Sequence, residues 1–453
     1  MQIIGLATIV SRPSELRWPK HPRMKIPDRL RRGGAEACWV ALGQGLGLIG
    51  AFAAIKMLTD QLGPAEYGRL ALGLSAAGIL HMFIYGPVEQ TALRYLSIFR
   101  ERQELGLLFH FLRKAHLLLF FSIACVAFSV GFLNMLFGES RWGILIATAA
   151  ILGIFSGINS TLSSLQTAMR QRRPVAIFQA GDVWLRLGLA LLAMAALGIS
   201  ADSALVGFSL ASIIIMVAQA SFLHQQPDLL PSLKSTNFSQ EIRQKRRAEL
   251  FAYGLPYVIF AGFAWLGAYA DRWLLMVFED THTVGIYAAM IQIANAPVAL
   301  FIGMTNQYLV PIIFDRAGGG SSAQVASSAR LLAYAIAAYS IVLSLIVLSM
   351  ALFAEPLVLL LTNPAFSYHS GVLWILSAAL GVASMAQLLV LRGLSQSRSR
   401  QYILPKFIQV LALFATGLVM VPNLGLAGMC FALVASSLCY LGAVLFVNRQ
   451  SAA

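Results

Sequence analysis

The sequence has 453 residues, of which 58% are hydrophobic and only 11% are charged, and its formal net charge is +14. A soluble domain usually carries about 25% charged residues, so this composition excludes a soluble protein of this size. The basic residues lie between long apolar runs, which indicates that they set membrane orientation, and we expect no nucleic-acid partner.

The apolar runs are about 20 residues long, which lets a helix cross a hydrocarbon core of about 30 Å. We therefore predict an all-α integral membrane protein with about twelve transmembrane helices. In chain order, the predicted helices cover residues 35–57, 69–91, 115–137, 142–168, 174–198, 203–223, 250–278, 283–312, 330–353, 371–394, 402–420 and 424–446.

The segments between the predicted helices alternate between two kinds. One kind is strongly basic and comprises residues 1–34, 94–114, 170–173, 243–247 and 398–400. The other kind is short and nearly free of lysine and arginine, as in GPAEYG at 63–68 and VPNLG at 421–425. Basic segments remain in the cytoplasm, so we expect both termini to be cytoplasmic.

The two halves of the sequence resemble each other at a shift of 217 residues. IGAFAAIK at 49–56 overlays LGAYADRW at 266–273, and Gly68, Gly86 and Gln90 meet Gly285, Gly303 and Gln307. Chance matching between glycine- and alanine-rich helices is the alternative. A true repeat predicts two pseudo-symmetric six-helix lobes around a cavity. The expected organisation is a cytoplasmic tail at 1–34, a first lobe at 35–223, a cytoplasmic linker at 224–249, a second lobe at 250–447 and a tail at 448–453.

Polar side chains inside the predicted helices are candidates for a cavity wall. A charged group at the bilayer centre costs about 3 kcal/mol and therefore usually faces protein or water. Helix one carries Lys56, helix two carries Glu89, and helix eight carries Gln292, Asn295 and Asn306 at helical spacing. Two alternatives remain: the stripe on helix eight forms a hydrogen-bonded packing seam, and Lys56 snorkels outward.

Helix five places Gln179, Asp182 and Arg186 on one face. Asp182 precedes Arg186 by one turn, which is the favourable order for an ion pair within a helix. This pair either neutralises itself for structural reasons or forms part of a cavity wall. Helix four adds hydroxyls, which are weak signals because they often bond to their own helix: Ser156, Ser160, Ser163 and Thr167.

Helix seven carries Asp271 and Arg272, which lie about 100° apart around the helix axis. We expect Asp271 to face a closely packed helix and Arg272 to face the cavity together with Trp265 and Tyr269. An interfacial belt of aromatic and basic residues is the alternative. Helix eleven adds Lys406 near the expected cytoplasmic side.

Two segments carry a resemblance to a known family. LTDQLGPAEYGRLAL at 58–72 and YGLPYVIFAGFAWLGAYADRWLLMVFEDTHTVGIYAAMIQIA at 253–294 resemble the polysaccharide (Wzx-like) flippase family of the MATE-related exporter superfamily. The matching positions are Gly254, Pro256, Asp271, Arg272, Gly285 and Tyr287. The resemblance implies a bacterial inner-membrane protein with a cavity between two lobes, alternating access, and a lipid-linked oligosaccharide built on polyprenyl pyrophosphate as substrate.

The sequence therefore predicts a flippase rather than an enzyme, with membrane lipids and other polysaccharide assembly proteins as partners. No Walker phosphate loop and no clustered metal ligands occur in the sequence, so we expect no cofactor and no metal. Two rival functions remain, a MATE-like drug or cation antiporter and a membrane enzyme of glycan assembly. The basic candidates inside the helices argue against a cationic substrate.

Overall fold

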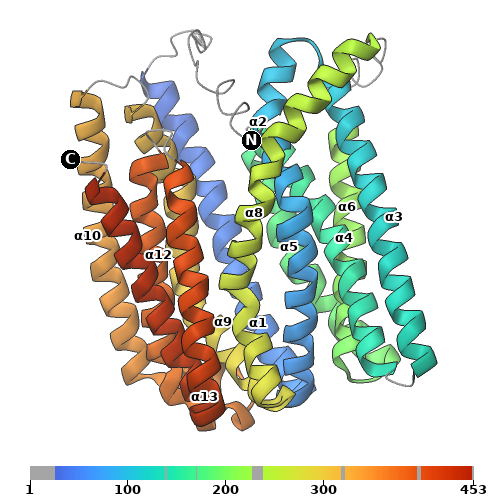
Figure 1. Ribbon diagram of the computed structural model, residues 1–453, viewed down its shortest axis with the longest axis vertical. Coiled ribbons are helices and arrows are strands. Elements are labelled where there is room, and N and C mark those ends of the chain that lie inside the picture. Colours follow the sequence, from blue (N-terminus) through green and yellow to red (C-terminus); the bar gives the residue numbers. More distant parts are fainter. Residues whose placement is uncertain are drawn as a thin grey trace, which may run out of the picture.

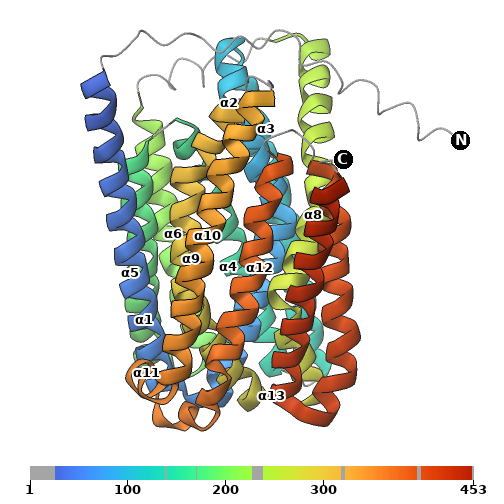
Figure 2. The same cartoon turned by 90° about the vertical axis from the view of Figure 1, so that its left-hand side faces the viewer.

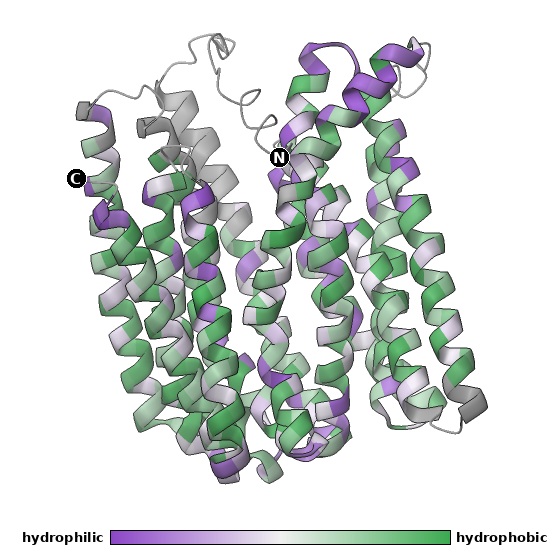
Figure 3. Cartoon of the chain, viewed as in Figure 1, coloured by the Kyte–Doolittle hydropathy of each residue, from purple (hydrophilic) through white to green (hydrophobic). Residues whose placement is uncertain are grey.

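The computed structural model describes residues 26–137, 140–169, 171–226, 238–317, 322–394 and 399–450, and the regular elements in these ranges are helices that run side by side as long rods (Figure 1). Hydrophobic residues dominate the middle of the rods, while hydrophilic residues gather toward their ends (Figure 3). This arrangement confirms the all-α membrane class. The elements are α1 Ile26–Ile79, η1 Leu80–Tyr85, α2 Gly86–Glu101, α3 Leu105–Phe137, α4 Ser140–Ala168, α5 Arg172–Leu197, α6 Ala201–His224, α8 Gln240–Phe278, α9 Thr281–Ala317, α10 Ser322–Leu352, α11 Ala354–Leu361, η2 Pro364–Val372, α12 Leu373–Leu394, η3 Ser399–Tyr402 and α13 Ile403–Gln450.

Ten helices in the described ranges are long and apolar enough to cross a membrane. Two of them, α1 and α13, fold back on themselves at glycines with positive φ, Gly63 (65°) and Gly425 (53°). In α13 the two arms are hydrogen-bonded, because the Ser436 hydroxyl donates to the carbonyl oxygen of Gln409 at 2.9 Å. Figure 2 shows these arms as neighbouring rods. The exact number of twelve helices stays a prediction.

Several predicted boundaries at the basic end of the bundle are wrong. The predicted loop at 94–114 is helical except at residues 102–104, and α8 begins at Gln240, so the predicted basic loop at 243–247 is helical too. The physical reason is that these helices continue past the apolar run and are held there by ion pairs. Arg246 lies 2.6 Å from Glu104, and Arg102 lies 3.2 Å from Glu249.

The helices form two groups that meet along α1, α8 and α9 (Figure 1). The largest buried cluster contains residues from both groups, such as Leu72, Leu205, Tyr287 and Leu413. The second arm of α1 packs directly on α9 at closely apposed glycines, Gly68 and Gly285. These contacts hold the two lobes together and leave a cavity on either side of the second arm of α1.

Candidate functional site

A cavity of about 660 Å³ lies inside the bundle, mostly within the first lobe. The second arm of α1, η1, α2, α4, α5 and α6 supply most of its wall, and α8 and α9 close it from the second lobe. Many of the residues singled out from the sequence meet here: Glu89, Gln179, Asp182, Arg186, Tyr269, Arg272 and Gln292.

The charged pair on α5 is formed as its spacing requires. The guanidinium of Arg186 lies 2.9 Å from the carboxylate of Asp182, and it also donates a hydrogen bond of 3.1 Å to the Ser212 hydroxyl on α6. Both side chains border the cavity. Because the two charges are opposite and adjacent, this pair adds little net charge to the cavity.

Arg272 and Asp271 leave α8 in different directions. Asp271 is buried, and its carboxylate accepts hydrogen bonds from the Tyr287 hydroxyl on α9 at 2.5 Å and from the backbone nitrogen of Arg272 at 2.8 Å. The guanidinium of Arg272 instead lies 5.0 Å from the ring centre of Tyr269 and borders the cavity. Its Nε atom is buried without a hydrogen-bond partner, and Arg272 forms no ion pair with any side chain that the structure describes.

Arg272 therefore differs from Arg186, because it forms no ion pair within 4.0 Å with a described side chain. A guanidinium binds phosphate and carboxylate oxygens through a fork of N–H donors, and it stays charged when it is dehydrated. The face of Tyr269 stabilises the same cation.

One face of α4 forms a wall of hydroxyls and amides. The Ser164 hydroxyl donates to the Glu89 carboxylate at 3.0 Å, and the Ser163 hydroxyl donates to the side-chain oxygen of Gln219 at 3.3 Å. The side-chain amide of Asn159 donates to the carbonyl of Ser212 at 2.9 Å. The polar residues of this face are Ser156, Asn159, Ser160, Ser163, Ser164 and Thr167.

Sequence reasoning missed Asn159, Ser164, Gln219 and His81 as cavity residues. A signal for two of them was present, because Asn159 precedes Ser163 by four residues and Ser164 follows Ser160 by four, so both share a helical face with hydroxyls already noted. Gln219 and His81 stand alone in apolar helices, and no local pattern distinguishes them.

A second cavity of about 500 Å³ lies between α1, α5 and α9 and contains Asn295 in its wall. It shares Gln179 and Gln292 with the first cavity. A third space of about 140 Å³ also borders Gln179 and reaches Arg172, the first residue of α5. The polar space therefore extends from the middle of the bundle to the end that carries the basic segments.

Contacts between the two lobes close the opposite end of this space. The Tyr67 hydroxyl donates to the side-chain oxygen of Gln292 at 3.0 Å, and the Tyr67 ring meets the buried ring of Phe366 edge-on at 5.9 Å. Nearby, Lys56 donates to the carbonyl oxygen of Thr362 at 2.8 Å.

The remaining predicted residues lie away from the cavity walls. Lys56 pairs with Asp60 at 3.3 Å in addition to its bond to Thr362. The Trp265 indole donates to the carbonyl oxygen of Ser75 at 3.0 Å, so it braces α8 against α1. Lys406 is buried within the second lobe, 4.8 Å from the ring centre of Tyr440. Asn306 is not among the residues whose side chains the structure describes.

No group of three potential metal ligands occurs in the described ranges.

Comparisons with known proteins give a family and a fold. The model of the family described as "Polysaccharide biosynthesis protein" matches residues 34–316. No curated protein sequence matches the chain. Among solved structures, the inward-facing conformation of a multidrug resistance MATE family transporter of the MOP superfamily has a TM-score of 0.64 at 14% identity, covering 92% of this chain and 93% of the other. The outward-facing conformation of such a transporter has a TM-score of 0.62 at 14% identity, covering 91% and 94%.

A Vibrio cholerae MATE transporter in its bent form has a TM-score of 0.59 at 15% identity, covering 93% of this chain and 97% of the other. At such low identity these structures show a shared fold, a transporter fold of two lobes, and do not show a shared substrate.

Proposed function

Because this chain belongs to the polysaccharide biosynthesis protein family, we propose that it is a flippase that moves an oligosaccharide linked to polyprenyl pyrophosphate across the bacterial inner membrane. The family and the fold make the protein a multi-pass membrane transporter and not an enzyme. We propose both the substrate and the location in the bacterial inner membrane.

The polar cavity inside the bundle is the observation that carries this proposal. Each glycan hydroxyl that enters hydrocarbon without a hydrogen-bond partner costs several kcal/mol. The hydroxyl and amide wall of α4, together with Gln179 and Gln292, offers donors and acceptors in place of water. A sugar in this cavity retains hydrogen bonds while its polyprenyl tail remains in lipid.

Arg272 is the residue that we expect to hold the pyrophosphate. Its guanidinium borders the cavity and forms no ion pair within 4.0 Å among the described residues, whereas Arg186 is already paired with Asp182. The buried Asp271 bonds to Tyr287 on α9 and fixes the stretch of α8 from which Arg272 projects. We therefore expect Arg272 to contribute more than Arg186 to binding an anionic linker.

The conformation described here is suited to loading from the cytoplasm. The polar space reaches the basic end of the bundle, and basic segments face the cytoplasm. The interlobe contacts of Tyr67 and Lys56 close the other end. Delivery to the outer leaflet then requires these contacts to break while the basic end closes, which is the alternating access expected of two repeated lobes. Both chain termini lie in the cytoplasm in this arrangement, where other assembly proteins supply the substrate.

Export of a drug or another organic cation is the second candidate, and the Glu89 carboxylate in the cavity is the observation that favours it. Ser164 already donates a hydrogen bond to this carboxylate, and the Arg272 guanidinium borders the same space. A cationic substrate bound at Glu89 would therefore also meet repulsion from the Arg272 guanidinium.

The test is to purify the full chain, reconstitute it in vesicles and measure translocation of a fluorescent oligosaccharide on polyprenyl pyrophosphate. A membrane-impermeant quencher reports the leaflet that the glycan occupies. Parallel vesicles are loaded with a fluorescent organic cation. Translocation of the glycolipid without cation efflux supports the flippase, while cation efflux without glycolipid translocation supports the antiporter and rejects our proposal.

A further inference from the structure

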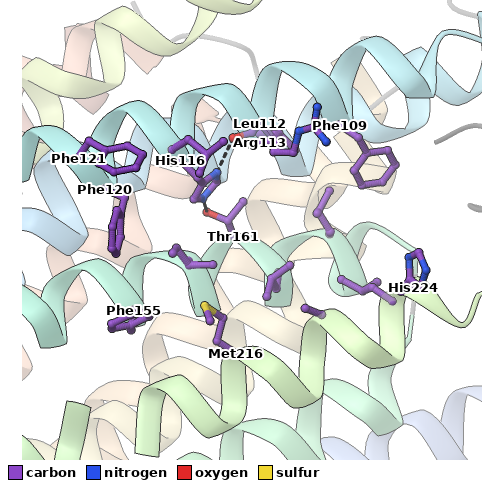
Figure 4. Close-up of a pocket in the computed structure, with 16 residues that line it drawn as sticks. Phe109, Leu112, Arg113, His116, Phe120, Phe121, Phe155, Thr161, Met216 and His224 are labelled. Carbon is purple, nitrogen blue, oxygen red and sulfur yellow. Dashed lines mark hydrogen bonds between the residues drawn. The ribbon is translucent and has the colours of Figure 1, made fainter. Parts of the chain in front are cut away.

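A separate groove of about 530 Å³ lies on the outer side of the first lobe, between α3, α4 and α6 (Figure 4). Its wall is apolar and rich in aromatic rings, including Phe120 and Phe155, and Met216 lines it too. The groove occupies the face of α4 that carries Ile158 and Leu165, whereas the polar cavity occupies the face that carries Ser156 and Ser163. The two spaces are therefore separated by α4.

The groove opens onto the surface that surrounding lipid contacts. Leu117 and Phe121 line it and are 52% and 66% exposed in the isolated chain. From Phe109 to Phe121 the α3 wall is about 18 Å long at 1.5 Å per residue. This length is close to half of a hydrocarbon core of about 30 Å, the depth of one leaflet.

One end of the groove is basic. Arg113 on α3 and His224 at the end of α6 both line it and are both exposed (Figure 4), and no aspartate or glutamate is part of its wall. His116 lies deeper and is engaged within the wall, since its ring nitrogens contact the Leu112 carbonyl at 2.7 Å and the Thr161 hydroxyl at 3.2 Å. Arg113 is thus the charged group at the mouth of the groove.

We propose that this groove binds one anionic phospholipid of the leaflet at the basic end of the bundle. An acyl chain lies along the aromatic wall, and the headgroup phosphate lies at Arg113, beside His224. The length of the groove matches one leaflet, and its charge matches an anionic headgroup, which attracts basic residues at the membrane surface. Since α4 and α6 border both the groove and the polar cavity, the bound lipid supports the back of the cavity wall.

The test is native mass spectrometry of the detergent-purified full chain with phosphatidylglycerol or phosphatidylcholine of the same acyl chains. We expect one phosphatidylglycerol to bind more tightly than phosphatidylcholine, and Arg113→Gln to weaken it about five-fold. Arg330→Gln is the matched control, because Arg330 is exposed and is the ninth residue of α10, as Arg113 is the ninth residue of α3. This control should bind like the unmodified chain.

A second variant tests the apolar part of the groove. Ala220 is an exposed residue of its wall, so Ala220→Trp fills the groove from the side of α6 without disturbing a buried contact. We expect this variant to lose the tightly bound lipid whatever its headgroup. Equal lipid binding by Arg113→Gln and Arg330→Gln, or undiminished binding by Ala220→Trp, overturns the proposal. Displacement of phosphatidylglycerol by a lower concentration of polyprenyl phosphate overturns it too, because the occupant is then a polyprenyl lipid.

Discussion

Gly68 and Gly285 lie against each other where the two lobes meet. A Cβ atom built on Gly68 would lie 2.8 Å from the backbone nitrogen of Gly285, and one built on Gly285 would lie 2.9 Å from the backbone nitrogen of Gly68. The Cβ atom on Gly68 would also contact the carbonyl oxygen of Thr281, and the Cβ atom on Gly285 would contact the carbonyl oxygen of Pro64. Thr281 follows Pro64 by 217 residues, the same shift that relates Gly285 to Gly68.

A two-fold axis between two repeats generates such reciprocal contacts. If residue i of one repeat contacts residue j of the other, the equivalent of j in the first repeat contacts the equivalent of i in the second. The reciprocal contact agrees with the glycine match between the halves of the sequence, in which Gly68 and Gly285 are equivalent positions. A two-fold axis that relates these two segments therefore passes close to this contact.

The first prediction concerns this contact. Gly68→Ala and Gly285→Ala each place a methyl group against backbone, so each should destabilise the chain by about 1–3 kcal/mol and reduce translocation. The measurement is thermal unfolding in detergent with the vesicle assay beside it. Gly188→Ala is the control, because a Cβ atom there meets no atom within 4 Å. An equal melting temperature for all three variants would show that the lobes separate easily at this point.

The second prediction concerns Arg272. Arg272→Ala should abolish glycolipid translocation while the amount of protein in the membrane stays near normal, because its guanidinium forms no ion pair within 4.0 Å with a described side chain. Arg272→Lys should restore only part of the transport, since an ammonium keeps the charge and loses the fork. Surface glycan in a deletion strain, normalised to membrane protein, gives the readout. Normal export by Arg272→Ala would place the anion site elsewhere.

The third prediction separates a structural pair from a binding group on α5. Arg186→Ala leaves Asp182 as an unpaired carboxylate at the cavity wall, whereas Asp182→Asn leaves Arg186 with its bond to Ser212. If Arg186 contacts substrate, Asp182→Asn should impair export less than Arg186→Ala. Equal losses in the two variants, accompanied by equal falls in melting temperature, identify the pair as structural.

The fourth prediction concerns access of water to the cavity. Single cysteines replacing Glu89, Asn295 and Ser163 should react quickly with a water-soluble thiol reagent, because these positions border the polar space. The background lacks the native cysteines, of which Cys125 and Cys439 are exposed. A cysteine replacing Leu118, which is 66% exposed on the outer face of α3, is the lipid-facing control. Equal rates at all positions would identify the polar stripe as a packing seam.

The fifth prediction concerns topology. A fluorescent protein that folds only in the cytoplasm should be bright when it is fused after residue 453, and a phosphatase that is active only in the periplasm should be inactive at the same site. A fusion to the segment between α5 and α6 should give the opposite pattern, because this segment lies at the other end of the bundle (Figure 1). The reverse result at both sites would invert the chain in the membrane and make the polar space open outward.

The properties that the sequence determined by itself depend on local spacing or on composition. The length of an apolar run decides whether a helix can span the membrane, and a spacing of four residues brings Asp182 to Arg186 in any helix. The neighbouring positions of Asp271 and Arg272 on a helix likewise separate their side chains by about 100°. These inferences need no knowledge of which helices meet.

The tertiary structure alone decided which polar groups share one space. The position of Lys56 in predicted helix one suggested that it lines the cavity. In the structure Lys56 instead donates a hydrogen bond to the carbonyl oxygen of Thr362, 306 residues away in the chain, and lies outside the cavity. Gln219 borders the cavity because α6 packs against α4, where the Ser163 hydroxyl donates a hydrogen bond to it. The sequence around this single amide in an apolar helix does not indicate which residue it contacts. The physical reason is that a helix presents several faces, and long-range packing between helices selects the one that meets water.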